Sequence, residues 1–153
     1  MGEVVPGLLP NRLLLTALLG ASLCSAAWGR LGGDLASVQA DQQAWVASVV
    51  QTRLGSATLY AQTLPDGQVV RQYVDAAGLV FAVGWEGHVL PDFERLLGPH
   101  FAAYAVAQRQ QRRGVSVQNA DLVIESGGMM RSFAGRAYLP AHLPAKLTAL
   151  DIR

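Results

Sequence analysis

The first spacing pattern along the chain is helical. Ser37 is suited to capping a helix N-terminus, because its hydroxyl accepts a hydrogen bond from a free backbone N–H. The apolar residues that follow recur mainly on one side of a helix, and they are Val38, Trp45, Val46, Val49 and Val50. This spacing predicts a helix that ends near Gly55.

An alternating pattern comes next and predicts three β-strands, at residues 58–64, 68–74 and 79–86. Two turns of similar chemistry join them, Pro65-Asp66-Gly67 and Asp75-Ala76-Ala77-Gly78. The glycine that closes each turn takes the left-handed backbone that returns the chain. Two tight hairpins in succession predict an antiparallel meander.

The third of these strands has one bulky and one small face. Phe81, Val83 and Trp85 fall on the bulky face. The small face carries Val80, Ala82 and Gly84. We expect the bulky face to form the core, with further apolar bulk supplied by Phe93, Leu97 and Phe101.

A second helical region is predicted from Pro91, with Asp92 and Glu94 in the first turn, where the helix dipole favours negative charge. Helical spacing resumes after Gly98-Pro99 and ends before Gly114.

Two more strands are predicted at residues 121–126 and 131–139, joined by a turn at Gly127-Gly128. We expect the last segment, residues 140–153, to form a loop or a short helical turn. This order of elements is typical of an α+β domain with a five-stranded, mainly antiparallel sheet and helices packed on one face.

The N-terminal segment has the pattern of a cleavable signal peptide. Arg12 precedes a run of about a dozen mainly apolar residues, which is shorter than the ~20 that a membrane-spanning helix requires. Small residues follow, and cleavage is predicted after Ala27, which leaves one domain over residues 28–153. The alternative interpretation is an uncleaved membrane anchor.

Cys24 falls inside this predicted signal, residues 1–27. It follows Leu23, whereas the residue before a lipidated cysteine is small, so we interpret Cys24 as part of the discarded segment. The predicted mature chain then has no cysteine, which excludes disulfides and thiol chemistry from it.

Composition removes several other classes. Hydrophobic residues make up 51% of the 153 residues and charged residues 15%, which is too apolar for a disordered chain. With 12 Lys and Arg against 11 Asp and Glu, the net charge of +1 gives no electrostatic case for a nucleic-acid partner. The basic cluster of residues 109–113 is interpreted as a solvated helix end, and Arg71, Arg131 and Arg136 as the solvent side of the sheet.

A series of short motifs runs through the predicted mature chain. Among them are Leu31-Gly32-Gly33, Leu64-Pro65-Asp66-Gly67, Leu90-Pro91-Asp92, Ser126-Gly127-Gly128-Met129-Met130-Arg131 and the terminal Asp151-Ile152-Arg153. They resemble the family of short exported bacterial proteins known as domain of unknown function 2844. The resemblance implies an envelope or secreted location and no established activity, so it assigns no catalytic or binding residue. It also leads us to expect glutamate where Gln72 stands.

The enzyme hypothesis that the sequence allows is a hydrolase with a site assembled in space. Ser126, His88 and Asp92 are its candidate residues, with Gly127 and Gly128 as backbone donors for an oxyanion hole. The chain has no G-x-S-x-G elbow, and a hairpin turn explains the glycines more simply.

Metal and cofactor sites have no support in the sequence. The three histidines, His88, His100 and His142, lack the spacing that places two imidazoles on one helix face, so no metal site is expected. No G-x-G-x-x-G or Walker motif occurs, and no cofactor is expected.

The preferred function is therefore a small, non-enzymatic protein of the cell envelope, periplasmic or secreted. We expect it to bind a partner protein or ligand through an exposed face or edge of its sheet. The hydrolase is the alternative.

Overall fold

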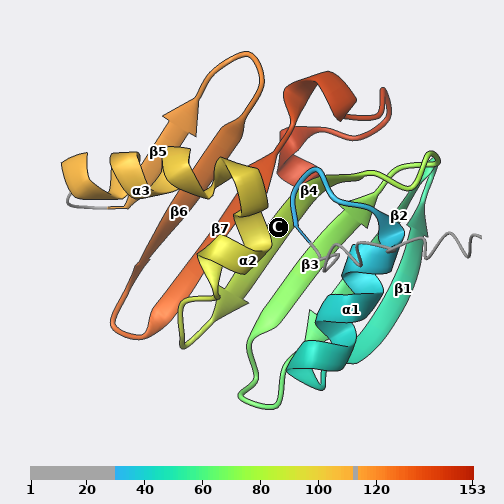
Figure 1. Cartoon of the computed structure of the whole chain (residues 1–153), viewed down its shortest axis with the longest axis horizontal. Helices are drawn as coiled ribbons and strands as arrows, with labels where there is room; N and C mark the ends of the chain where they lie inside the picture. Colours follow the sequence, from blue (N-terminus) through green and yellow to red (C-terminus); the bar gives the residue numbers. More distant parts are fainter. Residues whose placement is uncertain (1–29, 112–113) are drawn as a thin grey trace, which may run out of the picture.

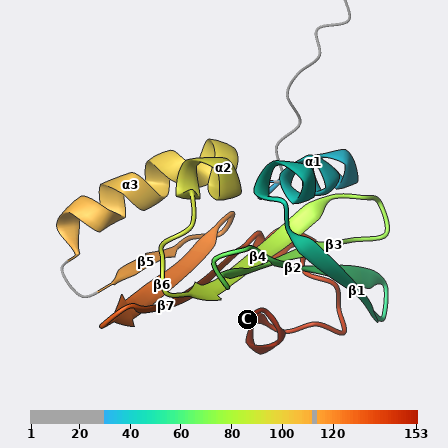
Figure 2. The same ribbon diagram turned by 90° about the horizontal axis from the view of Figure 1, so that it is seen from below.

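A computed structural model describes residues 30–111 and 114–153, so the predicted signal peptide with Cys24 lies outside the described residues. One antiparallel sheet of seven strands, in the order β1-β2-β3-β4-β7-β6-β5, carries the helices on one face (Figures 1 and 2). The strands are β1 Ser48–Leu54, β2 Ala57–Thr63, β3 Val69–Val74, β4 Val80–Gly87, β5 Val115–Gln118, β6 Val123–Met129 and β7 Ser132–Tyr138. The helices are α1 Leu35–Trp45, α2 Phe93–Leu97 and α3 Phe101–Gln110, with short 3₁₀ turns η1 Gly98–His100, η2 Pro140–His142 and η3 Ala149–Asp151. The α+β class and the helix-covered face are confirmed.

The prediction of five strands was wrong, because two further strands, β1 and the short β5, form the edges of a seven-stranded sheet. At one edge, α1 ends at Val46, whose φ of 52° is left-handed, and β1 follows at once. The expected helix is therefore shorter, and its last residues form a strand instead. At the other edge, β5 pairs with β6 over only four residues.

The first helix is also capped differently from the expectation. The side chain of Asp34, not Ser37, is the N-cap, and its carboxylate accepts a hydrogen bond from the backbone N–H of Ser37 at 2.9 Å. Ser37 itself lies buried in the first turn, where its hydroxyl bonds the carbonyl oxygen of Asp34. Asp34 also forms an isolated bridge with Leu79, which anchors the start of α1 beside β4.

The main core fills the space between the helices and the sheet. Val83, Trp85 and Leu97 are fully buried there, and Phe93 lies between two aromatic rings. The ring of Phe93 packs edge-on against Trp85 at 5.1 Å between centroids and stacks on Tyr104 at 4.4 Å. Phe101 is partly buried against this cluster.

Phe81 corrects the predicted bulky face of β4. The register between β3 and β4 shifts at Tyr73 and Val74, where a bulge adds one residue to β4. Val80 therefore lies in the helix-side core, whereas Phe81 packs on the opposite face with Tyr73 and Ile152. A bulge moves a side chain to the other face, which strict alternation does not predict.

The C-terminal segment covers part of that opposite face. Residues 140–153 form two 3₁₀ turns separated by loop, as expected, and cross the sheet on the side away from the helices (Figure 2). Ile152 is buried there, and the hydroxyl of Tyr73 donates to the carbonyl oxygen of Asp151 and accepts from the N–H of Arg153, both at 3.1 Å. Any side chain at Gly84 would collide with the backbone of Arg153. Glycine at this position lets the segment lie flat on β4.

The hairpin between β6 and β7 turns later than expected. Met129 pairs with Ser132, so the loop consists of Met130 and Arg131 alone, with φ of 51° and 67°. Gly127 and Gly128, predicted as the turn, belong to β6.

Candidate functional site

The three residues of the hydrolase hypothesis have separate partners. Burial raises the pKa of the Tyr104 hydroxyl, and a side-chain hydrogen bond with Ser126 opposes this shift. His88 Nδ1 lies 2.8 Å from the carbonyl oxygen of Arg131, and the Asp92 carboxylate accepts from the N–H of Arg95 as the N-cap of α2. Within the residues that the structure describes, no hydrogen bond or ion pair joins Ser126, His88 and Asp92 to one another. Each of the three side chains therefore bonds a different part of the fold: Ser126 bonds Tyr104, His88 bonds the β6–β7 turn, and Asp92 caps α2.

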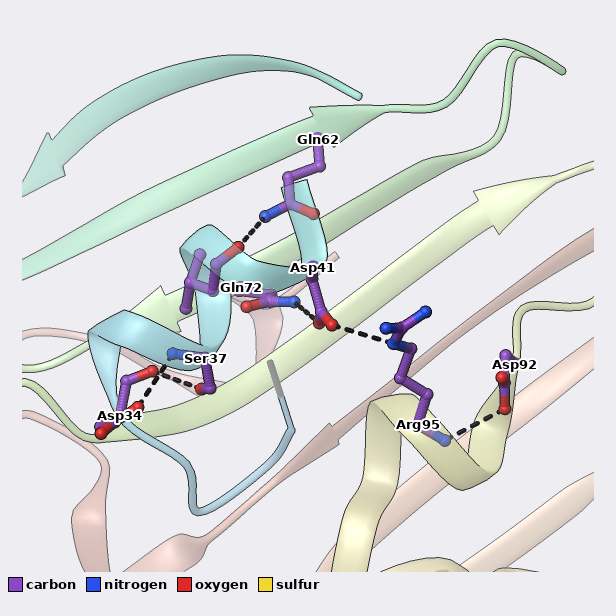
Figure 3. Close-up of polar contacts among 8 residues, drawn as sticks. Asp34, Ser37, Asp41, Gln62, Gln72, Asp92 and Arg95 are labelled. Atoms are coloured by element: carbon purple, nitrogen blue, oxygen red, sulfur yellow. Dashed lines mark hydrogen bonds and ion pairs between the residues drawn. The ribbon is translucent and has the colours of Figure 1, made fainter. Parts of the chain in front are cut away.

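A buried polar cluster, which the sequence did not indicate, lies between the helices and the sheet. Asp41 of α1 is fully buried, and its Oδ1 lies 3.2 Å from Nε of Arg95 in α2 (Figure 3). Its Oδ2 accepts from Nε2 of Gln72 in β3 at 3.0 Å. Beside it, the buried Gln62 of β2 donates to the carbonyl oxygen of Val38 at 3.1 Å.

This cluster holds two helices in register over the sheet. Asp41 meets a cation from α2 on one side and an amide from the sheet on the other, so its charge is compensated without solvent. Arg95 also lies over the ring of Trp45, at 5.8 Å from its centroid. An ionised glutamate at position 72 would have no proton to donate to Asp41, whereas the amide of Gln72 does. Because Asp41 and Gln72 have no exposed surface, the cluster positions elements rather than contacting a substrate.

The open half of the other sheet face carries a hollow of about 600 Å³. Residues that alternate onto this face form its floor, and Ile152 and Arg153 lie at its side. Its side chains include Glu86, Ser116, Glu125, Ala134 and Arg136. The hollow is a shallow, mixed-charge surface.

The arginines on this face are paired. Nη2 of Arg71 lies 2.7 Å from Oε1 of Glu86. Nη2 of Arg136 lies 2.7 Å from Oε2 of Glu125. Nη1 of Arg136 also donates to the carbonyl oxygen of Ala149, which ties the C-terminal segment to β7. These ion pairs compensate the charges of both arginines within the fold, consistent with the polar side of the sheet. Arg131 lies in the β6–β7 turn instead.

The two edges of the sheet differ. At β5, the side-chain amide of Gln111 bonds the backbone of Ser116 twice, with Nε2 donating to its carbonyl oxygen at 2.9 Å and Oε1 accepting from its N–H at 2.7 Å. Gln111 thus stands where a neighbouring strand would pair. At β1, no further strand lies outside the seven residues Ser48–Leu54 in the described part of the chain. We call this the β1 edge.

Metal sites and membrane-spanning helices are two further features that the described residues could contain. Groups of three or more His, Cys, Asp or Glu residues arranged for a metal ion are not found in residues 30–111 and 114–153. The helices of these residues include none with the length and apolar character needed to cross a membrane.

Comparison with known proteins gives a family but no activity. No curated protein and no solved structure matches the chain. A family model does match, over residues 27–152, which spans all of the described fold but Arg153 and confirms the resemblance carried by the sequence motifs. The chain belongs to the family described as Protein of unknown function (DUF2844).

Proposed function

We propose that the chain is an exported, non-enzymatic binding protein that takes an extended segment of a partner protein along its β1 edge. The proposal continues from the N-terminal pattern, in which a basic residue, a short apolar run and small residues precede Trp28. It places the protein in the periplasm or outside the cell. The observation that carries the binding role is the difference between the two sheet edges.

Unpaired edge strands offer free backbone N–H and C=O groups, and natural proteins shorten, charge or cover them. The β5 edge follows this rule, because it has only four residues and Gln111 bonds its backbone. The β1 edge is seven residues long, contains no proline or lysine, and carries one charge, at Arg53. An edge left open in this way favours a partner strand.

The side chains of β1 define what kind of segment fits. Val50 and Thr52 alternate onto the face of the C-terminal segment, and Val50 is 65% exposed. Gln51 and Arg53 alternate onto the helix side. A partner strand with β-branched or apolar residues opposite Val50 and Thr52 would cover them and complete the backbone ladder. We therefore expect the partner segment to be extended and apolar on one face.

Site-specific photo-crosslinking in living cells tests this proposal. A photoreactive residue at Gln51 is expected to crosslink a partner protein. Arg53→Pro, which removes a backbone N–H that the register turns away from β2, is expected to abolish that crosslink. The matched control is the same photoreactive residue at Ser116 on the β5 edge. Crosslinks that are equal at both edges, or that survive Arg53→Pro in a folded protein, would contradict the proposal.

The location is tested separately. Cell fractionation is expected to recover the protein outside the cytoplasm, and N-terminal sequencing is expected to begin at Trp28. A chain that retains residues 1–27 and sediments with the membrane would support the alternative of an uncleaved anchor.

A further inference from the structure

We propose that the β6–β7 hairpin tip and the adjoining β4–α2 loop form a docking surface for an anionic phospholipid bilayer. We call this surface the tip patch, and it consists of residues 87–90 and 129–131. It lies at the end of the hairpin, away from the two edge strands, so this proposal is independent of partner binding at the β1 edge (Figure 1).

The first observation is exposed apolar surface. Met130 is 93% exposed and Met129 is 73% exposed, while Val89 and Leu90 are 54% and 42% exposed. These four are half of the eight large hydrophobic residues exposed in the part of the chain that the structure describes. Single exposed apolar residues are ordinary, but a group of them on one surface marks an interaction site.

The second observation is backbone strain at the same place. Met130 and Arg131 both adopt the left-handed region in a two-residue hairpin loop, where Asn-Gly is the favoured sequence. A methionine and an arginine at these positions cost stability that asparagine and glycine would not. The chain thus retains bulky and cationic side chains at a position where small residues would be more stable.

The third observation is that the two segments form one surface. His88 Nδ1 lies 2.8 Å from the carbonyl oxygen of Arg131, and because a carbonyl only accepts, the imidazole donates this hydrogen bond. Behind the hairpin, Leu90 and Phe133 line the same hollow of about 200 Å³. The loop after β4 and the hairpin tip therefore present their apolar side chains together.

Charge identifies the partner. Arg131 is the one charged residue of the tip patch, residues 87–90 and 129–131. Of the carboxylates beside it, Glu86 pairs with Arg71 and Asp92 caps α2. A protruding turn with flexible thioether side chains beside a cation fits the interface of a bilayer, where apolar groups enter the acyl boundary and cations meet anionic headgroups.

A fluorescent label at the tip tests insertion. In a full-length chain with Cys24→Ser, the variant Met130→Cys is labelled with an environment-sensitive fluorophore, and the matched control is Ala76→Cys in the exposed turn at the opposite end of the sheet. Vesicles of phosphatidylglycerol and phosphatidylethanolamine are expected to shift the Met130→Cys emission to the blue and to leave that of Ala76→Cys unchanged. An equal response at both positions, no response at Met130→Cys, or an equal response with pure phosphatidylcholine would overturn the proposal.

A second variant separates binding from folding. Met130→Asn with Arg131→Gly is expected to fold at least as stably as the native chain and to bind the anionic vesicles about tenfold more weakly. Unchanged vesicle binding by this folded variant would overturn the proposal. Protection of the Met130→Cys label by detergent-solubilised membrane proteins in the absence of lipid would assign the surface to a protein partner instead, and would also overturn it.

Discussion

Asp41 and Arg95 form an ion pair between α1 and α2, with 3.2 Å between Oδ1 and Nε, although 54 positions of sequence separate them. The carboxylate is fully buried, and the arginine side chain is 19% exposed. One helix therefore depends on the other for the compensation of a charge that has no access to water.

Removing one member of this pair is expected to cost more than removing both. Asp41→Leu should lower the free energy of unfolding by about 3 kcal/mol, because it leaves the Arg95 guanidinium without its buried counter-charge. Adding Arg95→Met should recover part of that loss, since apolar side chains replace the pair. Urea unfolding of the three proteins measures both effects. Equal stabilities of the single and double variants would show that the pair does not couple the helices.

The hairpin loop predicts a gain of stability. Met130→Asn with Arg131→Gly should raise the free energy of unfolding by about 1 kcal/mol, because these residues adopt the left-handed backbone with less strain. Met130→Gln, which keeps a side chain of similar length in the same conformation, is the control and should change stability little. A melting temperature that falls in the double variant would argue against strain at this loop.

Gly84 and Gly127 lie on the same sheet face, but replacing each with alanine is expected to change stability by different amounts. Gly84→Ala should destabilise the protein by about 2 kcal/mol or more and expose residues 140–153 to protease, because the new methyl group collides with the backbone of Arg153. Gly127→Ala meets no atom within 4 Å and should stay within about 0.5 kcal/mol of the native chain. Limited proteolysis and thermal denaturation distinguish them, and similar losses in both variants would contradict the packing of the C-terminal segment.

His100 predicts a dependence of stability on pH. Burial lowers the pKa of this imidazole from its ordinary 6.5, so near and below that pH the unfolded chain binds the proton more readily than the folded chain. This contribution to stability is present above about pH 6.5 and decreases as the pH falls toward the lowered folded-state pKa. His100→Gln should flatten the loss of melting temperature over this window. If the two proteins lose stability in parallel, His100 is not responsible.

The hydrolase alternative makes a prediction of its own. A site built on Ser126 requires that the native chain hydrolyse activated esters above the uncatalysed rate and that Ser126→Ala remove this activity. We expect the native chain to give no turnover above the uncatalysed rate, because Ser126, His88 and Asp92 each have partners in different segments. Turnover that depends on all three residues would restore the hydrolase.

Elements with strong local signals could be predicted from sequence. The turns at Pro65-Asp66-Gly67 and residues 75–78 carry glycines with φ of 84° and 88°, and the strands on either side follow within one or two residues. Their conformation depends on the turn residues themselves, so it needs no distant contact. The helix N-terminus near Asp92 could be predicted for the same reason.

Elements set by tertiary contacts could not be predicted. Val46 ends α1 in a left-handed conformation that valine rarely adopts, and nothing in the local sequence marks it. The apolar residues on both sides of Val46 keep helical spacing, so the sequence pattern predicts more helix where the structure has β1. The β-branched run Val49, Val50 and Thr52 was the one available signal. The bulge at Phe81 likewise depends on pairing with β3.

The candidate site was harder still to predict than the fold. Gln72 lies 31 positions after Asp41, and Arg95 lies 23 positions after Gln72. All three are residue types that are usually exposed on the protein surface. Their proximity follows from the packing of α1 and α2 on the sheet, which only a tertiary structure supplies. The β6–β7 turn was predicted at Gly127-Gly128, because glycines favour turns, whereas the structure has it at Met130 and Arg131.

The hydrogen bonds between Gln111 and Ser116 also limit how copies of this chain can associate. Growth of a sheet through many molecules needs two competent sides on every unit, so that each addition creates a place for the next. A molecule in which a single glutamine occupies one side has strand pairing available on the other side alone. Two molecules that pair through their β1 edges form a closed dimer with no free strand edge for a third molecule, so a fibre cannot grow from it.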